Sequence, residues 1–358
     1  MISAQKACQY KDAEITSWNV QDTVAAAVEE WNRDVFSKIQ VATDESQNKT
    51  NLVLLYSSLY FMHLMPSDRS GENPLWKSTD HWDDFYTLWD IFRCTVSLYH
   101  LIQPTYYASM IRSLIDIWKH EGYMPDGRSG EYSGIVQGGS NADNVLADAY
   151  VKGLTGINWT EGYQAMVKDA EVTPYNTFSL TDPSNGIAFG RGALDDWKKL
   201  GYIAQDHNTR SLSRAVEYSQ NDFALSQVAK DVAPQDYHKY LKRAAQWQNQ
   251  WANITHKSFT GFLSPRLANG KFNLTDYNPA LCGGCEWVSK TMNRRLLNGL
   301  RRCAGLSEEE NVSQRPRKYT LAPRKVSVRW RWSLTCPSIL YKTAADPSIL
   351  LFVGRHLL

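Results

Sequence analysis

The sequence predicts an all-α protein whose antiparallel helices form a toroid, with the long loops gathered on one face. Apolar residues recur with a helical period through most of residues 1–287, and the alternation typical of β-strands is nearly absent. Long loops rich in Gly, Asp, Asn and aromatic residues separate the helices, and loops of that kind usually carry function. Because each apolar stripe needs a neighbour to bury against, the helices are expected to pair.

Each predicted helix rests on an apolar stripe and on signals at its ends. Val24, Ala27, Val28, Trp31 and Val35 fall at i, i+3, i+4, i+7 and i+11, which predicts one amphipathic helix. Other stripes end at glycine or proline, as helices commonly do. The predicted helices cover residues 22–39, 107–118, 140–153, 193–200, 211–232 and 236–251.

The charge of the chain changes sign after Trp287. Residues 1–287 carry 25 Lys and Arg against 33 Asp and Glu, whereas residues 288–358 carry 14 against 4, so the net charges are −8 and +10. We therefore predict a folded domain over residues 1–287 and a basic, aperiodic tail over residues 288–358 that does not fold into it. A retained intron or a frameshift would explain such a tail. The alternative is a genuine basic segment that binds nucleic acid or an anionic membrane.

The localisation signals disagree with one another. We expect no membrane span, because the apolar runs are shorter than the ~18 residues that a span needs. The first residues lack a basic segment followed by an apolar one, so no secretory signal is encoded and the chain is cytoplasmic at face value. Asn-X-Ser/Thr triplets point instead to secretion of a full-length form. They begin at Asn48, Asn158, Asn253, Asn273 and Asn311.

Six cysteines are scattered along the chain, and two of them form the short motif Cys282-Gly-Gly-Cys285. This motif is compatible with a small disulfide loop, a redox pair or half of a metal site. No second Cys or His pair stands at zinc spacing, so a structural loop is favoured and no metal-ligating residue is predicted.

The composition suits a carbohydrate site, since 13 Trp, 19 Tyr and 11 Phe stand beside many Asp and Asn. A sugar presents apolar C–H faces and a ring of hydroxyl groups. Its site therefore needs flat aromatic walls and side chains that donate and accept hydrogen bonds. Sugar-cleaving enzymes also favour the helical toroid that the stripes predict.

Four collinear blocks carry a resemblance to a known family. They read TLWDIFR from Thr87, QGGSNADNVLADAYVKG from Gln137, SRAVEYSQNDFALSQVAK from Ser213 and FNLTDYNPALCGGCEW from Phe272. In this order they resemble glycoside hydrolase family 92, the calcium-dependent exo-α-mannosidases, in its fungal branch, over nearly all of residues 1–287. The resemblance implies an (α/α)6 toroid and inverting hydrolysis of terminal α-linked (α-1,2) mannose from N-glycans or mannan.

Two parts of the family pattern are not found in this sequence. The family's N-terminal β-sandwich has no counterpart, and neither do the later blocks that include the general base, so the resemblance implies an incomplete toroid truncated at both ends. Calcium is the family's cofactor, but most of the carboxylates that help to hold it come from those later blocks. We therefore expect weak or no specific calcium binding by this chain.

Glu217 is the candidate catalytic residue. It lies in mid-helix beside Leu212, Ala215 and Val216, where an unpaired carboxylate would be costly. By resemblance it matches the family's general acid, which gives a proton to the leaving oxygen and whose pKa would be raised by burial. The alternative is a glutamate on the solvent face of its helix.

Trp89, Asp90, Asn141, Asp143 and Asp222 are the candidate substrate-binding residues. By resemblance Asp90 is the sugar-binding aspartate, and Trp89 offers an aromatic face beside it; the alternative for Asp90 is an acid that stabilises the helix dipole. Asn141 and Asp143 have two interpretations, because Ser-Asn-Ala-Asp is also ordinary capping chemistry. Asp222 lies about one turn after the proposed acid, where it would orient that acid or be solvated. We expect the acid, Trp89 and Asp90 to face one cleft.

Three functions follow from these observations. The first is an exo-α-mannosidase acting on mannose-containing glycans, and the second is a catalytically dead fragment that keeps part of the sugar-binding surface. The third, a non-enzymatic helical interaction protein, is disfavoured because helical spacing alone does not produce four collinear blocks. Nucleic acid is not expected as a partner. A general base would distinguish the active mannosidase from the dead fragment, since inversion needs a second carboxylate roughly 6.5 to 9.5 Å from the acid. In the tail, Glu308 and Asp346 are candidates for that base.

Overall fold

The computed structural model describes residues 3–42, 48–85, 87–136, 138–175, 189–256, 258–275 and 277. Its helices are α1 (Ala4–Glu14), α2 (Val20–Asp34), α3 (Lys49–Met62), α4 (Leu88–Ile91), α5 (Thr95–Ile102), α6 (Pro104–Glu121), α7 (Asn141–Val151), α8 (Trp159–Glu171), α9 (Leu194–Lys199), α10 (Ser211–Val232) and α11 (Tyr237–Ala244). Short 3-10 helices are η1 (Phe36–Lys38), η2 (Pro234–Asp236) and η3 (Ala245–Gln250). The strands are β1 (Ser67–Asp68), β2 (Trp82–Asp83), β3 (Arg128–Ser129), β4 (Tyr132–Ser133), β5 (Trp251–His256) and β6 (Phe259–Leu263).

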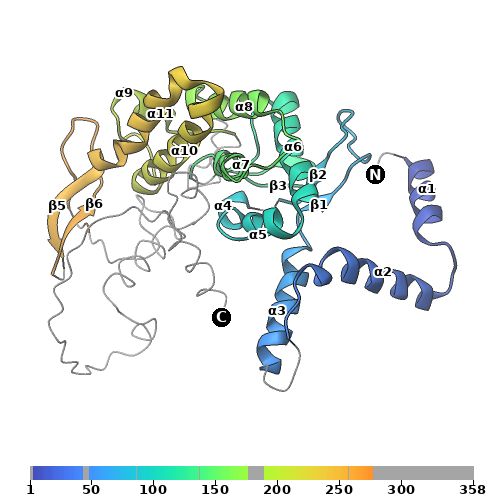
Figure 1. The fold of residues 1–358 in the computed structure, drawn as a ribbon. Coiled ribbons are helices and arrows are strands. Elements are labelled where there is room, and N and C mark those ends of the chain that lie inside the picture. The colour runs from blue at the N-terminus through green and yellow to red at the C-terminus, as the bar shows by residue number, and fades with distance from the viewer. Residues whose placement is uncertain are drawn as a thin grey trace.

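Helices dominate these residues, which confirms the helix-rich character of the predicted fold. The named strands form three separate antiparallel pairs, β1–β2, β3–β4 and β5–β6, so the described part of the chain has no central sheet. The long helix α10 packs against α7, α8 and α11, and α6 packs against α5, α7 and α8 (Figure 1). The closed (α/α)6 toroid remains a prediction.

The main core lies where α6, α7, α8 and α10 meet. On α6 the predicted stripe is buried, with Tyr107, Met110 and Ile111 each 0% exposed. Fully burying an apolar side chain of this kind stabilises the fold by ~1.5–3 kcal/mol. The helix begins at Pro104, where a missing N–H costs nothing, and ends at Glu121, directly before Gly122, whose φ of 86° is left-handed. The stripe and the stop at Gly122 predicted from the sequence are both confirmed.

The helix predicted over residues 22–39 is interrupted. α2 ends at Asp34, and the 3-10 helix η1 follows. Val35 leaves helical geometry with φ −122° and ψ −63°, and it is only 6% exposed. The break turns this side chain toward the interior. The rest of the predicted stripe is not covered by described residues, since Val24 and Val28 remain 50% and 55% exposed.

The helix predicted over residues 236–251 is α-helical only in its first half, is a 3-10 helix in its second half and stops one residue early. α11 ends at Ala244, η3 follows, and Trp251 begins the β5–β6 hairpin. At the turn Ser258 has φ 70°, and in β6 Gly261 has φ 92°, a region that glycine adopts without strain. The Thr, Ile, Trp and Phe residues of this segment favour a strand. That signal was available in the sequence and was missed.

The first three helices form an N-terminal arm that extends from the body (Figure 1). Among the residues of α1, α2 and α3, only Leu59 is buried. Gln103 joins the arm to the body: its Oε1 lies 2.7 Å from His63 Nε2, and its Nε2 donates to the backbone oxygen of Asp34 at 2.8 Å. No helix in the described residues is both long enough and apolar enough to cross a membrane.

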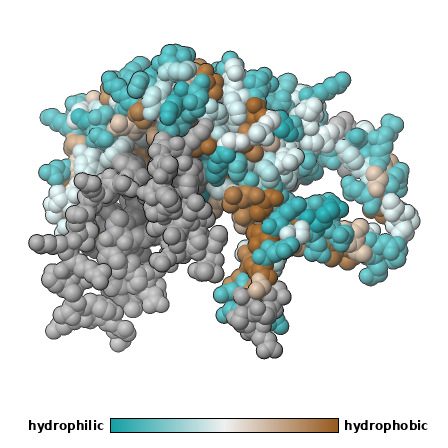
Figure 2. Space-filling model, viewed as in Figure 1, coloured by the Kyte–Doolittle hydropathy of each residue, from teal (hydrophilic) through white to brown (hydrophobic). Residues whose placement is uncertain are grey.

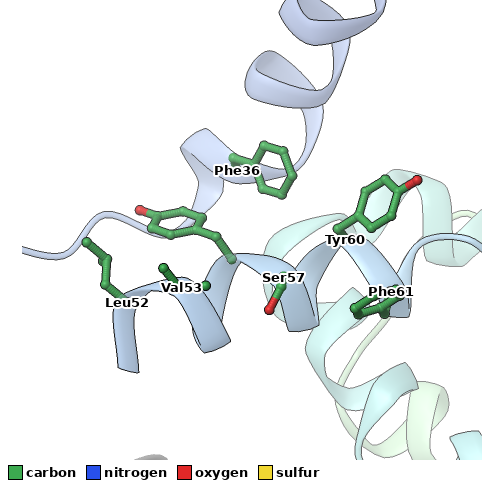
Figure 3. Close-up of a pocket in the computed structure, with 7 residues that line it drawn as sticks. Phe36, Leu52, Val53, Ser57, Tyr60 and Phe61 are labelled. Carbon is green, nitrogen blue, oxygen red and sulfur yellow. The ribbon is translucent and has the colours of Figure 1, made fainter. Parts of the chain in front are cut away.

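An open apolar groove lies on this arm between η1 and α3. Figure 3 shows Phe36 facing the side chains of α3, among them Tyr60, and the groove has a volume of about 550 Å³. Figure 2 shows that hydrophobic surface continues over α3, where Val53 and Phe61 are 59% and 67% exposed. The groove contains none of the predicted site residues.

Candidate active site

Glu217 lies in the middle of α10 and contacts the loop that precedes α7. The backbone N–H of Gly139 donates to Glu217 Oε2 at 2.6 Å, and Asn141 Nδ2 lies 3.5 Å from the same oxygen. The side chain is half-buried, and burial raises the pKa of its carboxyl above the usual 4.5. The hydrogen bond from Gly139 opposes that rise, because it favours the ionised form.

Two glycines allow the loop to approach α10 this closely. A Cβ atom on Gly138 would lie 2.5 Å from Glu217 Cδ, and one on Gly139 would lie 2.9 Å from Glu217 Cβ. Real atoms do not come this close, so a side chain at position 138 would displace the carboxyl of Glu217 or the loop, and one at position 139 would displace the loop from α10. The Gly-Gly pair of the QGGSNAD block is therefore required by the close approach of backbone to the carboxyl.

Asp126 is a second carboxyl at this site, and sequence reasoning did not select it. Its Oδ1 accepts from the backbone N–H of Asn141 at 2.9 Å, and its Oδ2 is buried without a hydrogen-bond partner among the described residues. The residue is 2% exposed, and burial, followed by the charge of Glu217, raises its pKa well above 3.8. Asp126 stands in a Met-Pro-Asp-Gly turn with no periodic signal, so only the folded structure identifies it.

A chain of three buried asparagines leads from the interior to Glu217. Asn221 Nδ2 donates to Asn144 Oδ1 at 3.3 Å, and Asn144 Nδ2 donates to Asn141 Oδ1 at 3.1 Å. The side chains are at most 2% exposed, and each amide orients the next, which leaves Asn141 Nδ2 for the carboxyl. Asn141 and Asn144 are spaced i, i+3 on α7 and so share a face. That spacing could have identified Asn144 from the sequence.

A buried ion-pair network lies beside this chain of amides. Arg191 donates from Nη2 to Asp143 Oδ2 at 2.8 Å and from Nη1 to Asp222 Oδ1 at 2.7 Å. Arg243 donates to both oxygens of Asp222 at 2.7 and 2.9 Å, and Trp197 Nε1 donates to Oδ2 at 2.7 Å. Burial opposes ionisation of Asp222, but the charges of the two arginines outweigh it and lower its pKa. The network ties α7 and α10 to α11 and to the segment before α9.

Asp143 and Asp222, both predicted to bind substrate, lie inside this network. Both are 0% exposed. The oxygens of Asp222 are occupied by Arg191, Arg243 and Trp197. Asp143 Oδ2 accepts from Arg191 and from Ser140 Oγ, and burial raises the pKa of Asp143 to about 6.

Trp89 and Asp90 lie on the short helix α4, which packs against α7. Trp89 is half-buried and Asp90 is exposed, with Thr87 Oγ1 donating to Asp90 Oδ2 at 2.9 Å. The backbone N–H of Leu88 donates to the backbone oxygen of Asp126 at 2.8 Å. This bond places α4 beside the turn whose carboxyl neighbours the predicted acid. That Trp89 and Asp90 share a cleft with the acid remains a prediction.

The described residues contain no group of three or more His, Cys, Asp or Glu side chains arranged to hold a metal ion. A polar pocket of about 160 Å³ lies elsewhere, but its charges are paired: Arg112 with Asp80 at 2.8 Å and Lys119 with Glu161 at 2.6 Å. The predicted Cys282–Cys285 loop and the tail acids Glu308 and Asp346 fall outside the described residues.

Comparisons with known sequences identify relatives of this chain. The model of the glycosyl hydrolase family 92 catalytic domain matches residues 6–305, which runs past the predicted boundary at Trp287. A protein of Arthroderma benhamiae described as an uncharacterized secreted glycosidase is 33% identical over 314 residues, covering 82% of this chain and 35% of that protein. The chain therefore spans about a third of the length of the curated relative it matches.

Solved structures give the same fold. A family GH92 inverting mannosidase from Bacteroides thetaiotaomicron superposes with a TM-score of 0.68 at 21% identity, covering 80% of this chain and 38% of that one. A family GH92 alpha-mannosidase from the same organism, in complex with mannoimidazole, gives 0.67 at 22% identity, covering 80% and 37%. At these identities the likeness establishes the fold.

Proposed function

Because the chain belongs to glycosyl hydrolase family 92, we propose that it carries the acid side of an α-mannosidase site, which releases terminal α-linked (α-1,2) mannose from N-glycans or mannan with inversion. The observation that supports this most directly is the carboxyl of Glu217, half-buried, raised in pKa and held by the α7 loop. Since the chain spans about a third of its curated relative, the activity and substrates of a whole enzyme are part of the proposal. No observation favours a catalytically dead fragment instead.

In this proposal Glu217 is the general acid. Gly139 N–H and Asn141 Nδ2 both donate to Oε2, which leaves the proton of the neutral carboxyl on Oε1. That proton passes to the glycosidic oxygen as the bond from the anomeric carbon to that oxygen breaks, so the leaving sugar departs as a neutral alcohol. Burial raises the pKa and so keeps the acid protonated at higher pH. Activity should therefore fall as the pH rises through that raised pKa.

The general base is not assigned to any described carboxyl. Inversion needs a carboxylate that activates water on the opposite side of the sugar, roughly 6.5 to 9.5 Å from the acid. Asp126 interacts with Glu217, but burial raises its pKa and so favours its neutral form, which cannot take a proton from water. The charge of Glu217 adds to this rise, because an ionised carboxyl nearby disfavours a second negative charge on Asp126.

We propose a smaller set of sugar contacts than the sequence predicted. Trp89 and Asp90 keep the proposed role, because the first offers an aromatic face and the second an exposed carboxylate on α4. Asn141 contacts the acid and is proposed to position it. Asp143 and Asp222 are proposed to hold the scaffold, since burial and their arginine partners leave them no path to a ligand.

The described residues do not fit calcium as a ligand set. Calcium takes ~6 to 8 oxygen ligands, usually with several carboxylates, and no such cluster is present among them. We therefore propose weak or no specific calcium binding by this chain. We also propose that the protein is secreted, because the curated relative is described as secreted and the Asn-X-Ser/Thr triplets suit that route.

The test is release of mannose from α-1,2-mannobiose by the 358-residue chain, with and without azide. Azide is a small nucleophile that can attack the anomeric carbon where no base activates water. We expect product in at least one condition, in the β-configuration that inversion requires. Glu217→Gln should lower the rate ~10²- to 10⁴-fold, because general acid catalysis is worth that much.

The matched control is Glu29→Gln, the same chemical change at an exposed position on α2. It should leave the rate unchanged. Circular dichroism of each variant verifies that the helices are present. Product that persists in Glu217→Gln would contradict the role of this acid, and a folded chain without product in either condition would contradict the proposed function.

A further inference from the structure

The Asn-X-Ser/Thr triplets differ in whether the side-chain nitrogen of the asparagine is exposed and free of hydrogen bonds in the folded chain. N-glycosylation joins a sugar to the side-chain nitrogen Nδ2, so a glycan is compatible with the native fold only where this atom has room and no essential partner. Four triplets begin within the described residues, at Asn48, Asn158, Asn253 and Asn273, whereas Asn311 lies outside them. The hydrogen bonds of the four asparagines divide them into two groups.

Asn253 makes the fewest side-chain hydrogen bonds of the four within the described residues. It is exposed on β5, in the hairpin at one end of the body (Figure 1), and its side chain makes no hydrogen bond with another described residue. The register of the hairpin shifts between Ala252 and Thr255, so this asparagine stands at an irregular place in the ladder. The hydroxyl of Thr255, which completes the triplet, lies on the exposed edge 3.0 Å from Thr260 Oγ1. A bulky group on Asn253 would extend into solvent.

Asn48 and Asn158 are exposed helix caps that use only their side-chain oxygen. Asn48 Oδ1 accepts from the backbone N–H groups of Thr50 and Asn51 at 2.9 and 3.2 Å. Asn158 Oδ1 accepts from the backbone N–H of Glu161 at 3.3 Å. An N-glycosylated asparagine keeps its carbonyl oxygen, so both caps survive the modification. The nitrogen of each makes no hydrogen bond within the described part of the chain.

Asn273 differs from the other three because its nitrogen is engaged. It is half-buried, and Nδ2 donates to Gln205 Oε1 at 2.9 Å. Its backbone N–H donates to the Pro265 oxygen at 2.9 Å, which holds the residue against the neighbouring segment. A sugar on this nitrogen would meet Gln205 and remove the hydrogen bond.

We propose that Asn48, Asn158 and Asn253 are N-glycosylation sites and that Asn273 stays unmodified. This rests on secretion, which is part of the proposed function. In each transfer, Nδ2 attacks the anomeric carbon of an oligosaccharide carried on a polyprenyl pyrophosphate. The bond from nitrogen to that carbon forms, the bond from that carbon to the phosphate oxygen breaks, and the pyrophosphate leaves with the electron pair. The amide nitrogen loses one proton, which balances the charge.

The experiment expresses the full 358-residue chain behind a cleavable signal sequence in a eukaryotic host. Peptides from the medium and from the microsomal fraction are treated with an N-glycanase in heavy-oxygen water, which marks each formerly glycosylated asparagine by mass. We expect Asn48, Asn158 and Asn253 to be marked in the secreted protein and Asn273 to be unmarked. The Asn→Gln variant of each of the first three should lose one glycan on a gel, and Asn273→Gln should lose none.

The variant Gln205→Ala tests whether Asn273 stays unmodified because of its hydrogen bond to Gln205 or because its triplet is a poor acceptor. It frees the nitrogen of Asn273, so occupancy at Asn273 should rise while the other three sites keep theirs. Unmodified Asn253 in both fractions would overturn the proposal, as would Asn273 occupied equally with and without Gln205. The readout does not depend on mannosidase activity, so an inactive but glycosylated chain would count against the proposed function alone.

Discussion

Replacing Arg191 by Met tests whether the buried ion-pair network stabilises this fold. Arg191 is 0% exposed and donates to Ser140 Oγ at 2.9 Å, to Asp143 at 2.8 Å and to Asp222 at 2.7 Å. Methionine fills much of the same volume without the charge. After the change Asp222 still has Arg243, but Asp143 is left with the hydroxyl of Ser140 and the neighbouring carboxyl of Asp169, neither of which carries a positive charge.

The expected loss in the free energy of unfolding depends on how many buried carboxylates lose their positively charged partner. Removing one partner of a buried ion pair typically costs ~3–5 kcal/mol, because the remaining charge is uncompensated. Only Asp143 loses its sole cation here, so we expect the lower end, a loss of about 3 kcal/mol in the free energy of unfolding. Against a total of ~5–15 kcal/mol for typical domains, that is a large share.

Urea unfolding followed by circular dichroism measures this loss, with Arg112→Met as the matched control. Arg112 pairs with Asp80 at 2.8 Å, but its side chain is 38% exposed, and pairs of that kind are worth ~0–1 kcal/mol. A loss in Arg191→Met no larger than in Arg112→Met would refute the reasoning.

The pH dependence of the same measurement gives a second check. Burial raises the pKa of Asp143 to about 6, above the usual 3.8, so the folded protein binds this proton more tightly than the unfolded chain does. The stability that this carboxyl contributes is therefore present at low pH and is lost as the pH rises through about 6. Arg191 lowers this pKa, and its removal should raise the pKa further. The loss of unfolding free energy in Arg191→Met should thus be largest at neutral pH and become smaller toward about pH 4. A loss that does not change with pH would contradict this role of Asp143.

Three further outcomes are expected. Gly138→Ala should lower mannose release at least ~10-fold, because its Cβ would lie 2.5 Å from Glu217 Cδ. The control Gly162→Ala, whose Cβ would come no closer than 3.4 Å to its nearest neighbour, should leave the rate unchanged. Equal rates in the two variants would contradict the close approach of the loop to Glu217. Asn144→Leu should destabilise the fold by ~1–3 kcal/mol in urea, since it leaves Asn141 Oδ1 and Asn221 Nδ2 without the partners they have on Asn144. Asn144→Gln should not restore it, and an unchanged midpoint would count against the chain of amides. Calorimetry with calcium chloride should show no micromolar site, and a clear one would overturn the expectation of weak binding.

Local signals in the sequence were sufficient where neighbouring residues decide the structure. The stripe and glycine stop of α6, the start of α7 directly after Ser140 and the full span of α10 were each readable from spacing and end residues, because hydrogen bonds within a helix are local. The four collinear blocks led to the family. The resemblance to the family then pointed to Glu217 as the acid, since a glutamate in mid-helix is by itself more often on the solvent face. The β5–β6 hairpin was missed although its strand-forming residues were visible.

Other properties depend on residues that are distant in the chain. Asp222 and Asn221 are adjacent on α10, yet the first is paired with Arg191 and Arg243 while the second joins the amides that lead to the acid. Nothing near Asp126 in the sequence indicates that folding places it beside Glu217. The sequence by itself determined the family and predicted α2, α6, α7, α9, α10 and α11, whereas α1, α3, α4, α5 and α8 were not predicted. Only the tertiary structure decided which acids are neutralised and which keep a raised pKa, because burial and long-range charge pairs set the cost of ionisation.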